Sequence, residues 1–180
     1  MRLVPTPLPG LIQVEADPHQ DTRGQFARVY CRDSFLAAGV DFQPVQVNLS
    51  TNTAVHTLRG LHYQAGEFAE EKLVRCVAGR VWDVAVDLRH GPTRGKWHAV
   101  ELDAGRMNGI YIPKGFAHGF LSLTPGAVVQ YMMAPAYIPG HGRGITWNDT
   151  ALAISWPARP AVISEADAAL PPFASRPDLT

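Results

Sequence analysis

Proline and glycine recur at short, fairly regular intervals along this chain of 180 residues, which contains fifteen prolines and sixteen glycines. Both residues interrupt regular secondary structure, so they divide the chain into segments that are too short for most helices. This rhythm is typical of an all-β protein. We therefore expect a single domain over residues 1–180, with roughly ten strands closed into a double-sheet jelly roll or a barrel that hides its sheet edges.

Two stretches alternate between apolar and polar residues, as half-buried strands do. Residues 45–50 place three apolar side chains on one face and Gln46, Asn48 and Ser50 on the other. We expect this polar face to meet solvent, although the wet interior of a barrel is an alternative. The second stretch is residues 81–87, and Gly79 before it should form the tip of a hairpin. Further strands are expected at residues 97–102, 109–112, 119–123 and 127–133.

Helices are expected at two places only. The first runs from Asp33 to Ala38, where Asp33 is placed to cap the helix and Gly39 is placed to end it. The second begins at Ser164, because Ser164 and Asp167 have the spacing of a capping box with Asp in place of Glu. We expect residues 174–180 to be a frayed tail.

The charge balance and the cysteines narrow the classes of function. Sixteen basic and sixteen acidic side chains give a formal net charge of zero, so binding to nucleic acid or to an anionic membrane is not expected. The two cysteines, Cys31 and Cys76, do not form a metal-binding or disulfide pattern. No signal peptide and no apolar span of about 18 residues is visible. These features predict a soluble, cytoplasmic protein.

The residues that suggest chemistry are concentrated between Leu58 and Arg75. If this stretch forms two neighbouring strands, Arg59, His62 and Lys72 can point into one cavity. A base and two cations suit proton removal from a carbon acid whose anion, and whose attached phosphates, need positive charge nearby. The alternative is a structural histidine, a surface arginine and an exposed pair of Lys72 with Glu71. Polar residues are costly to bury in a segment otherwise built like core, which favours a site.

The same residues belong to a series of motifs that extends from near residue 10 to near residue 170. The motifs are Asp21–Phe26, Gln46–Ser50, Leu58–Gln64, Lys72–Val74, Asp83–Arg89, Ile112–Phe120, Tyr131 and Gly144–Asp149. With these motifs in this order, the chain resembles the dTDP-4-keto-6-deoxysugar 3,5-epimerases of rhamnose biosynthesis and related sugar epimerases of the cupin superfamily. The resemblance implies a cupin jelly roll, or double-stranded β-helix, with a few short helices.

The resemblance also implies roles for individual residues. His62 corresponds to the general base, Asp167 to the carboxylate that holds this base, and Tyr131 to the acid on the opposite face of the sugar. Arg59, Lys72 and His118 correspond to positions that hold the diphosphate and sugar or stabilise the oxyanion. Four further positions correspond to nucleotide or substrate contacts, namely Arg23, Phe26, Gln46 and Asn48.

The family's assembly and chemistry imply the partners. A partner subunit lends an N-terminal strand to the site, so a homodimer is expected. The protons on C3 and C5 are both adjacent to the 4-ketone and are acidic enough to remove if the enolate oxygen meets a cation or donor. No redox cofactor or metal is required.

Three positions depart from the family pattern. Arg28 stands where a glutamate is common, and a guanidinium cannot accept a hydrogen bond from thymine N3–H. It could donate to cytosine or guanine instead. Arg143 and Ala166 also replace residues common in the family. We therefore include Arg28 among the substrate-binding residues and leave open a 3- or 5-mono-epimerase that acts on a CDP- or GDP-linked keto sugar.

Two other classes of function remain open from the sequence. A metal-dependent cupin isomerase or dioxygenase would use His62 and His118, but Gln64 stands where such sites normally supply a second histidine. A sugar-nucleotide binding protein would keep the pocket and lack the chemistry.

Overall fold

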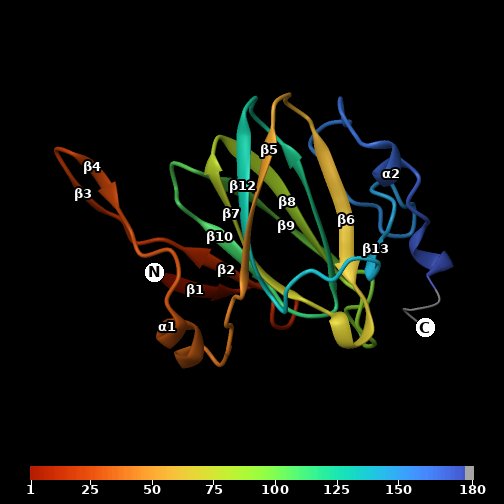
Figure 1. The fold of residues 1–180 in the computed structure, drawn as a ribbon, viewed down its shortest axis with the longest axis horizontal. Helices are drawn as coiled ribbons and strands as arrows, with labels where there is room; N and C mark the ends of the chain where they lie inside the picture. Colours follow the sequence, from red (N-terminus) through yellow and green to blue (C-terminus); the bar gives the residue numbers. More distant parts are fainter. Residues whose placement is uncertain (177–180) are drawn as a thin grey trace.

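The computed structural model describes residues 1–176 and consists mainly of two β-sheets packed face to face (Figure 1). One sheet has six strands in the order β1 (Arg2–Pro5), β2 (Ile12–Glu15), β10 (Gly109–Ile112), β7 (Glu71–Ala78), β12 (Ala127–Ala134) and β5 (Gln46–Asn52). The other has five strands in the order β13 (Gly142–Gly144), β6 (Leu58–Gln64), β11 (Phe116–Ser122), β8 (Arg80–Asp87) and β9 (Trp97–Asp103). This arrangement confirms the predicted all-β double-sheet fold.

The space between the sheets is apolar at one end and polar at the other. Val74 of β7 and Val129 of β12 are fully buried in a core cluster that also contains Phe120 of β11. Two residues further along the inward faces of the same strands, the side chains are Lys72 and Tyr131, which line a cavity. Because alternate residues of a strand share a face, one strand supplies both core and site.

The alternation of β5 is correctly predicted, but its orientation is the reverse of the expected one. Gln46, Asn48 and Ser50 line the cavity, whereas Val47 and Leu49 point outward and are 55% and 63% exposed. A period of two defines the two faces of a strand without saying which face is inside. Here the inside is a polar cavity.

Gly79 does not form the predicted hairpin. The strands on either side of it, β7 and β8, belong to different sheets, so the glycine turns the chain from one sheet to the other. Its φ of +69° is favourable for glycine, and an added Cβ would lie 2.2 Å from Thr124 Oγ1. The four later strands are found where they were expected, with β11 beginning three residues earlier than predicted.

Both predicted helices are present, with one difference in capping. Helix α1 is Arg32–Ala37, and Cys31 rather than Asp33 occupies its N-cap, without a side-chain cap. Helix α2 is Glu165–Ala168, and Ser164 Oγ accepts the Asp167 backbone N–H at 3.0 Å as predicted.

The described residues also contain two short 3-10 helices, η1 (Gly66–Phe68) and η2 (Phe173–Ser175). Residues 174 and 175 of the predicted tail belong to η2, and residues 177–180 lie outside the described residues.

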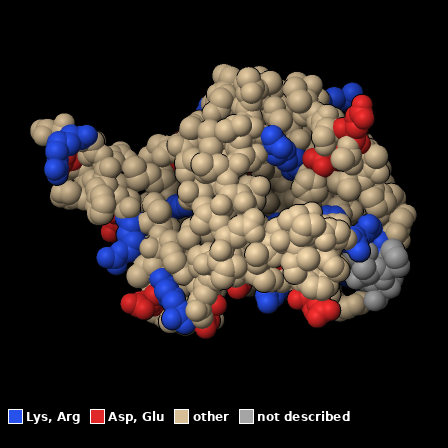
Figure 2. Space-filling view, viewed as in Figure 1, with Lys and Arg blue, Asp and Glu red and all other residues tan. Residues whose placement is uncertain are grey.

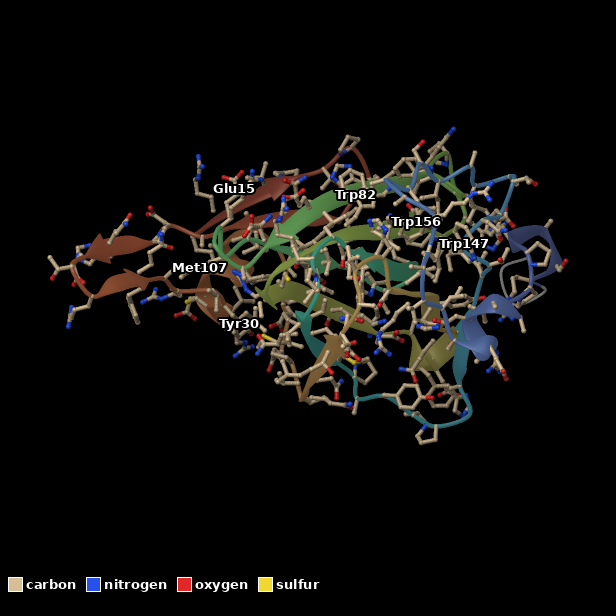
Figure 3. All side chains as sticks on the ribbon, turned by 90° about the horizontal axis from the view of Figure 1, so that it is seen from above. Glu15, Tyr30, Trp82, Met107, Trp147 and Trp156 are labelled. Carbon is tan, nitrogen blue, oxygen red and sulfur yellow. The ribbon has the colours of Figure 1, made fainter. Side chains whose placement is uncertain are left out.

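Segments outside the sandwich pack on part of the outer face of each sheet. The region of α1 packs Phe35 and Phe42 against Tyr111 on the six-stranded sheet. The C-terminal segment packs against the five-stranded sheet, where Trp156 lies on the same side as Trp82 (Figure 3). A hairpin of β3 (His19–Asp21) and β4 (Gly24–Phe26) projects away from the body as an arm (Figures 1 and 2). Within residues 1–176, no helix has the length and apolar character needed to cross a membrane.

Candidate active site

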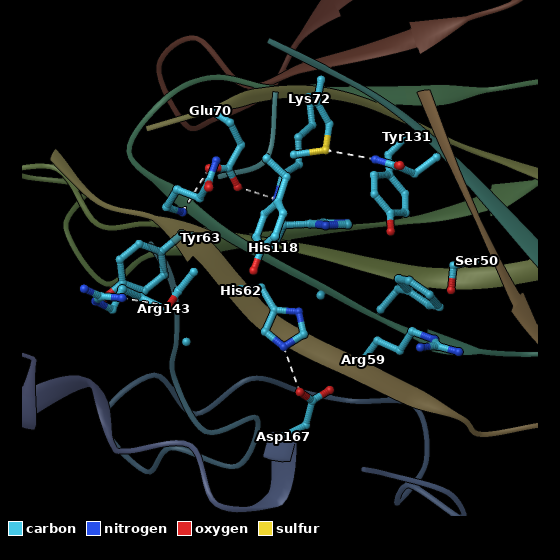
Figure 4. Close-up of a pocket in the computed structure, with 18 of the residues that line it drawn as sticks. Ser50, Arg59, His62, Tyr63, Glu70, Lys72, His118, Tyr131, Arg143 and Asp167 are labelled. Atoms are coloured by element: carbon cyan, nitrogen blue, oxygen red, sulfur yellow. Dashed lines mark hydrogen bonds and ion pairs between the residues drawn. The ribbon is translucent and has the colours of Figure 1, made fainter. Parts of the chain in front are cut away.

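A cavity of about 730 Å³ opens between the two sheets. This volume is in the range of sites for small organic ligands, which is about 300–1,000 Å³. Figure 2 shows a hollow on this face of the molecule, with basic side chains at its edge, and Figure 4 shows the residues that line the cavity. They come from both sheets, from α2 and from the segments beside β13.

His62 and Asp167 form a hydrogen-bonded pair on one side of the cavity. His62 Nε2 lies 2.8 Å from Asp167 Oδ1, and the Asp167 side chain is 10% exposed, compared with 49% for His62. The second oxygen, Asp167 Oδ2, accepts the Gly60 backbone N–H at 3.0 Å. Because a carboxylate only accepts hydrogen bonds, the Nε2 of His62 carries the proton. The other nitrogen, Nδ1, is then the one that can act as a base.

A bulge in β6 explains how Arg59 and His62 both face the cavity. Residues three apart on a regular strand point to opposite faces. On β6, however, the three steps from Arg59 to His62 lie opposite only two steps of β11, from Phe120 to His118. The extra residue reverses the alternation. Gly60 lies inside the bulge with φ of +119°, and an added Cβ would lie 2.6 Å from the Cα of Gly119.

Tyr131 enters the same cavity from the opposite sheet. It lies on β12 between Asn48 of β5 and Val74 of β7. Both Tyr131 and His62 line the cavity, and Figure 4 shows both side chains pointing into it. The structure therefore brings together the two groups that the sequence predicted to flank one ligand.

Lys72 forms a buried ion pair with a residue that the sequence analysis missed. Its Nζ lies 2.7 Å from Glu70 Oε1, and the two side chains are 11% and 4% exposed. The alternative pair of Lys72 with Glu71 is wrong, because Glu71 accepts a hydrogen bond from the Tyr111 hydroxyl instead. The strands β6 and β7 are also not neighbours in a sheet, since they face each other across the cavity.

A second histidine–aspartate pair lies beside the first. His118 of β11 is paired with His62 in the sheet, and its Nε2 lies 2.8 Å from Asp83 Oδ2. Asp83 is completely buried, and its Oδ1 has no partner among the described residues. The sequence offered a signal for Asp83, because it shares the face of the apolar residues Val81 and Ala85, where a charge requires a partner.

Arg59, Gln46 and Asn48 lie along the β5 side of the cavity. Arg59 Nε donates to Asn52 Oδ1 at 2.9 Å, which anchors the guanidinium at the edge of the six-stranded sheet. Gln46 Nε2 donates to Asn48 Oδ1 at 3.0 Å, and Gln46 Oε1 accepts the Tyr137 backbone N–H at 3.0 Å. These contacts hold three of the predicted substrate-binding side chains in fixed positions.

The other three predicted substrate-binding residues are not at the cavity of their own chain. Arg23 and Phe26 lie on the arm, where Arg23 pairs with Asp21 at 2.6 Å and Phe26 is 78% exposed. Arg28 is exposed in the segment that follows the arm. In one chain, the arm formed by β3 and β4 therefore lies apart from β6 and β12, the strands that carry His62 and Tyr131 (Figure 1).

The cavity favours an anionic ligand. Among the described residues that line it are four arginines or lysines and two carboxylates, Glu70 and Asp167, which are already paired. Clusters of cationic side chains in a concave site attract phosphates and other anions. Over residues 1–176, no three His, Cys, Asp or Glu side chains are grouped so that they could hold a metal ion.

Comparisons with known proteins agree with this geometry. Residues 5–175 match the family model described as dTDP-4-dehydrorhamnose 3,5-epimerase. The chain is 41% identical over 159 residues to the dTDP-4-dehydrorhamnose 3,5-epimerase of Sinorhizobium fredii, which covers 87% of this chain and 82% of the relative. The crystal structure of the enzyme of this name from Elizabethkingia anophelis has a TM-score of 0.93 and 39% identity, with 98% of each chain covered.

A further structure contains a ligand. The dTDP-6-deoxy-D-glucose-3,5-epimerase of Legionella pneumophila, in complex with dTDP-4-keto-L-rhamnose, has a TM-score of 0.91 and 35% identity, with 97% of this chain and 93% of that chain covered. The fold, the cavity and these similarities lead to one assignment. The chain belongs to the dTDP-4-dehydrorhamnose 3,5-epimerase family.

Proposed function

We propose that this protein epimerises a dTDP-linked 4-keto-6-deoxyhexose at C3 and C5, the reaction for which its relatives are named. One observation carries the proposal: His62 and Tyr131 line a single cavity from opposite sheets, and His62 is held by Asp167 at 2.8 Å. Inversion at carbon requires a base on one face of the sugar ring and an acid on the other. The two sheets supply these groups from opposite sides.

The proton transfers follow from the chemistry of these side chains. His62 Nδ1 removes a proton from a carbon beside the 4-ketone, and the electron pair moves to the ketone oxygen to form an enolate. Lys72 supplies the cation that stabilises this oxygen. His118, whose Nε2 is engaged by Asp83, lines the same cavity and would contact the sugar. The Tyr131 phenol gives its proton to the other face of the carbon. As the carbon is protonated, the electron pair returns from the oxygen and the ketone forms again. His62 then releases its proton to solvent and the Tyr131 phenolate takes one up from solvent, so these steps involve no oxidation or reduction.

The remaining predicted residues would hold the substrate. Arg59 is placed to bind the diphosphate, because a guanidinium matches the geometry of phosphate oxygens. Gln46 and Asn48 lie beside it on β5 and can donate to or accept from a nucleotide. Thymidine as the base is supported by the names of the relatives. Arg28, which replaces the glutamate common in the family, then contributes a donor or a phosphate contact rather than an acceptor.

We also propose that the working unit is a homodimer in which the arm of each chain reaches the cavity of its partner. Phe26 at 78% exposed, Val45 at 70% and Leu49 at 63% would be large apolar surfaces left in water by a single chain. Strand β5 is also an edge strand, which an isolated chain leaves open. Burial of this face in the dimer would place Arg23, Phe26 and Arg28 at the cavity of the partner chain. A cytoplasmic location fits the two free cysteines.

Hydrogen exchange in heavy water tests the activity. The enzyme is incubated with the dTDP-linked 4-keto-6-deoxyglucose in D₂O, and NMR measures deuterium at C3 and C5. We expect deuterium at both carbons with the wild type and background levels with His62→Ala. Label at one carbon alone would indicate a mono-epimerase. No exchange above the His62→Ala control, with dTDP-, CDP- and GDP-linked sugars alike, would contradict the proposal.

Two further controls separate the alternative functions. A sugar-nucleotide binding protein would raise its melting temperature with dTDP while it shows no exchange. A metal-dependent cupin would lose its activity after treatment with a chelator and regain it with a transition metal. We expect full activity in chelator.

A further inference from the structure

We propose that Glu70 is a positioning residue that holds the Lys72 ammonium charged and fixed against the substrate-binding cavity. The inference rests on the proposed function, because it concerns the cation that faces the developing enolate. Glu70 lies just before β7, and Lys72 is the second residue of that strand. Figure 4 shows the pair on the side of the cavity that faces His62 and Asp167.

Both oxygens of the Glu70 carboxylate are occupied. Oε1 lies 2.7 Å from Lys72 Nζ, and Oε2 accepts the Gln64 backbone N–H at 2.9 Å. The Glu70 side chain is 4% exposed. A buried carboxylate with two charge-assisted hydrogen bonds has little freedom to move. The ammonium that it holds is therefore fixed as well.

The backbone group that holds Glu70 is itself part of a rigid frame. Gln64 is 4% exposed, and its side chain donates from Nε2 to the Phe68 carbonyl at 3.2 Å. Its Oε1 accepts the Ile138 backbone N–H at 2.9 Å. Gln64 thus connects the end of β6 with η1 and with the segment after β12. Glu70 accepts the backbone N–H of Gln64, the residue at which these three elements meet. Its position is therefore fixed by packed backbone segments rather than by a mobile side chain.

Among the described residues, Lys72 has no other carboxylate partner in the cavity. Asp167 is engaged by His62 and Gly60, and Glu71 accepts from Tyr111. Among the residues that the structure describes, the other titratable or charged groups along the cavity come from β6, β11, β12, β13 and the C-terminal segment, and none of them is a carboxylate. They are His62, Arg59, Tyr63, His118, Tyr131, Arg143 and Arg176. A buried ammonium without a carboxylate loses its proton more easily, and neighbouring cations add to this tendency. Among the described residues, Glu70 is therefore the carboxylate that pairs with the Lys72 ammonium.

The consequence for the reaction is specific. An enolate oxygen is stabilised by a cation that is already in place, because no reorganisation is then needed as the charge develops. Without Glu70, Lys72 would lose either its position or its charge. The transition state would then be destabilised more than the bound substrate. The expected signature is a fall in kcat with little change in KM.

The kinetic test compares Glu70→Gln, Lys72→Met and the double variant. The glutamine keeps the shape and the acceptor for Gln64 N–H but removes the charge. We expect Glu70→Gln to lower kcat by about 10- to 100-fold, with KM within about 3-fold of wild type. In the Lys72→Met background the same change should have no further effect, because Glu70 acts through Lys72. Wild-type kcat in Glu70→Gln, or fully multiplicative losses in the double variant, would overturn the inference.

A second readout does not require activity. The free enzyme is treated with a limiting amine-acetylating reagent at pH 8, and mass spectrometry compares Lys72 with Lys96 and Lys114, the two exposed lysines of the chain. The uncharged amine is the reactive form, so Glu70→Gln should raise the rate at Lys72 several-fold relative to the other two. An unchanged labelling ratio would overturn the inference, whether or not the wild type exchanges the protons of the sugar. Absence of exchange in the wild type would instead contradict the proposed function.

Matched variants separate the charge of Glu70 from its structural role. Glu67→Gln removes a charge from an exposed residue of the neighbouring η1 and should leave kcat and the labelling ratio unchanged. Glu70→Asp retains the carboxylate and should recover part of the kcat lost in Glu70→Gln. If Glu70→Asp and Glu70→Gln are equally slow while both melt like the wild type, the charge is not the cause and the inference is wrong.

Discussion

The environment of His62 suits the removal of a proton, and that of Tyr131 suits the donation of one. His62 is half exposed and hydrogen-bonded to a buried aspartate, which orients the ring and stabilises it when it takes a proton. Tyr131 belongs to the strand at the other side of the cavity and is partly buried against the apolar core. In the proposed reaction, His62 can exchange its proton with solvent, whereas Tyr131 would meet the sugar from the side of the apolar core.

This division of roles predicts different outcomes for the two variants. Replacing Tyr131 by Phe removes the donor but leaves His62, so the base can still remove a proton and return one to the same face. We expect epimerisation to fall by about 10²- to 10⁴-fold, while deuterium continues to enter the substrate without inversion. NMR of the recovered sugar distinguishes labelled substrate from product.

The control for this variant is Tyr30→Phe. Tyr30 donates to the Phe42 carbonyl at 2.6 Å in the cluster beneath α1, outside the cavity. It should affect stability without changing the ratio of exchange to inversion. If Tyr131→Phe abolishes exchange as completely as His62→Ala, Tyr131 is not the acid of an independent second step.

Residue identities were predictable where a local motif carried them. The stretch around His62 and the capping pattern of Ser164 with Asp167 were visible in the sequence, and the family resemblance supplied Tyr131. Glu70 and Asp83 were missed, because the partner of a buried charge depends on the packing of elements. Asp83 meets His118 across 35 positions of the chain. Glu70 was not predicted, because Glu71 is one residue closer to Lys72 in the sequence and was the simpler choice of partner.

At the scale of elements, the errors have a common cause. The periodicity of β5 and the glycine at position 79 both describe local geometry, and both were correctly recognised as strand and turn. Which face of β5 is inside, and whether the turn joins two strands of one sheet or of two sheets, depends on the closure of the whole sandwich. The bulge of β6 was likewise invisible, although it places Arg59 beside His62.

The turn after β8 gives a prediction about stability. Asp87 is buried at the end of this strand and accepts hydrogen bonds from Arg89 Nε at 2.9 Å and Thr93 Oγ1 at 2.8 Å. Burial by itself would raise the pKa of Asp87, but the hydrogen bonds from Arg89 and Thr93 outweigh it, and the net pKa is lowered. The ionised form therefore stabilises the fold.

Because the folded pKa is lowered, this stabilisation is present above the unfolded pKa of about 3.9 and is lost as the pH falls through the folded value. We expect Asp87→Asn to reduce the free energy of unfolding by about 1–3 kcal/mol at pH 7. The difference from wild type should shrink steadily below about pH 4. Urea unfolding at pH 7, 5 and 3 measures this difference.

A constant difference over this range would mean that the charge of Asp87 is not involved. The exposed Asp17 serves as control, and Asp17→Asn should change stability by less than about 0.5 kcal/mol.

At the scale of the whole molecule, the proposed function requires residues that a single chain does not bring to its own cavity. The predicted nucleotide contacts on the arm lie away from the cavity, and the edge strand β5 exposes an apolar face. The organisation of residues 1–180 as one domain remains a prediction, and so does the dimer. The sequence could indicate contacts of the arm with a partner chain only through the family resemblance. Neither hydrophobic periodicity nor residue spacing reveals which chain's cavity an exposed arm contacts.

A mixed dimer decides whether the arm acts on its own chain or on its partner. One chain carries His62→Ala, and the other carries Arg23→Ala with Phe26→Ala. Each variant alone should be nearly inactive, because every site of such a homodimer has the same defect. Co-expressed with two different tags and purified through both, the heterodimer has one undamaged site if the arms are exchanged. It should then show about half of the wild-type kcat.

If the arm serves its own cavity, the same heterodimer has no undamaged site. The chain with intact His62 would still lack its own arm contacts, and activity would stay near that of the arm variant. Light scattering of each preparation verifies that dimers are being compared. An exchanged arm would also make activity depend on protein concentration near the dissociation constant of the dimer, since dilution removes Arg23 and Phe26 from the cavity that needs them.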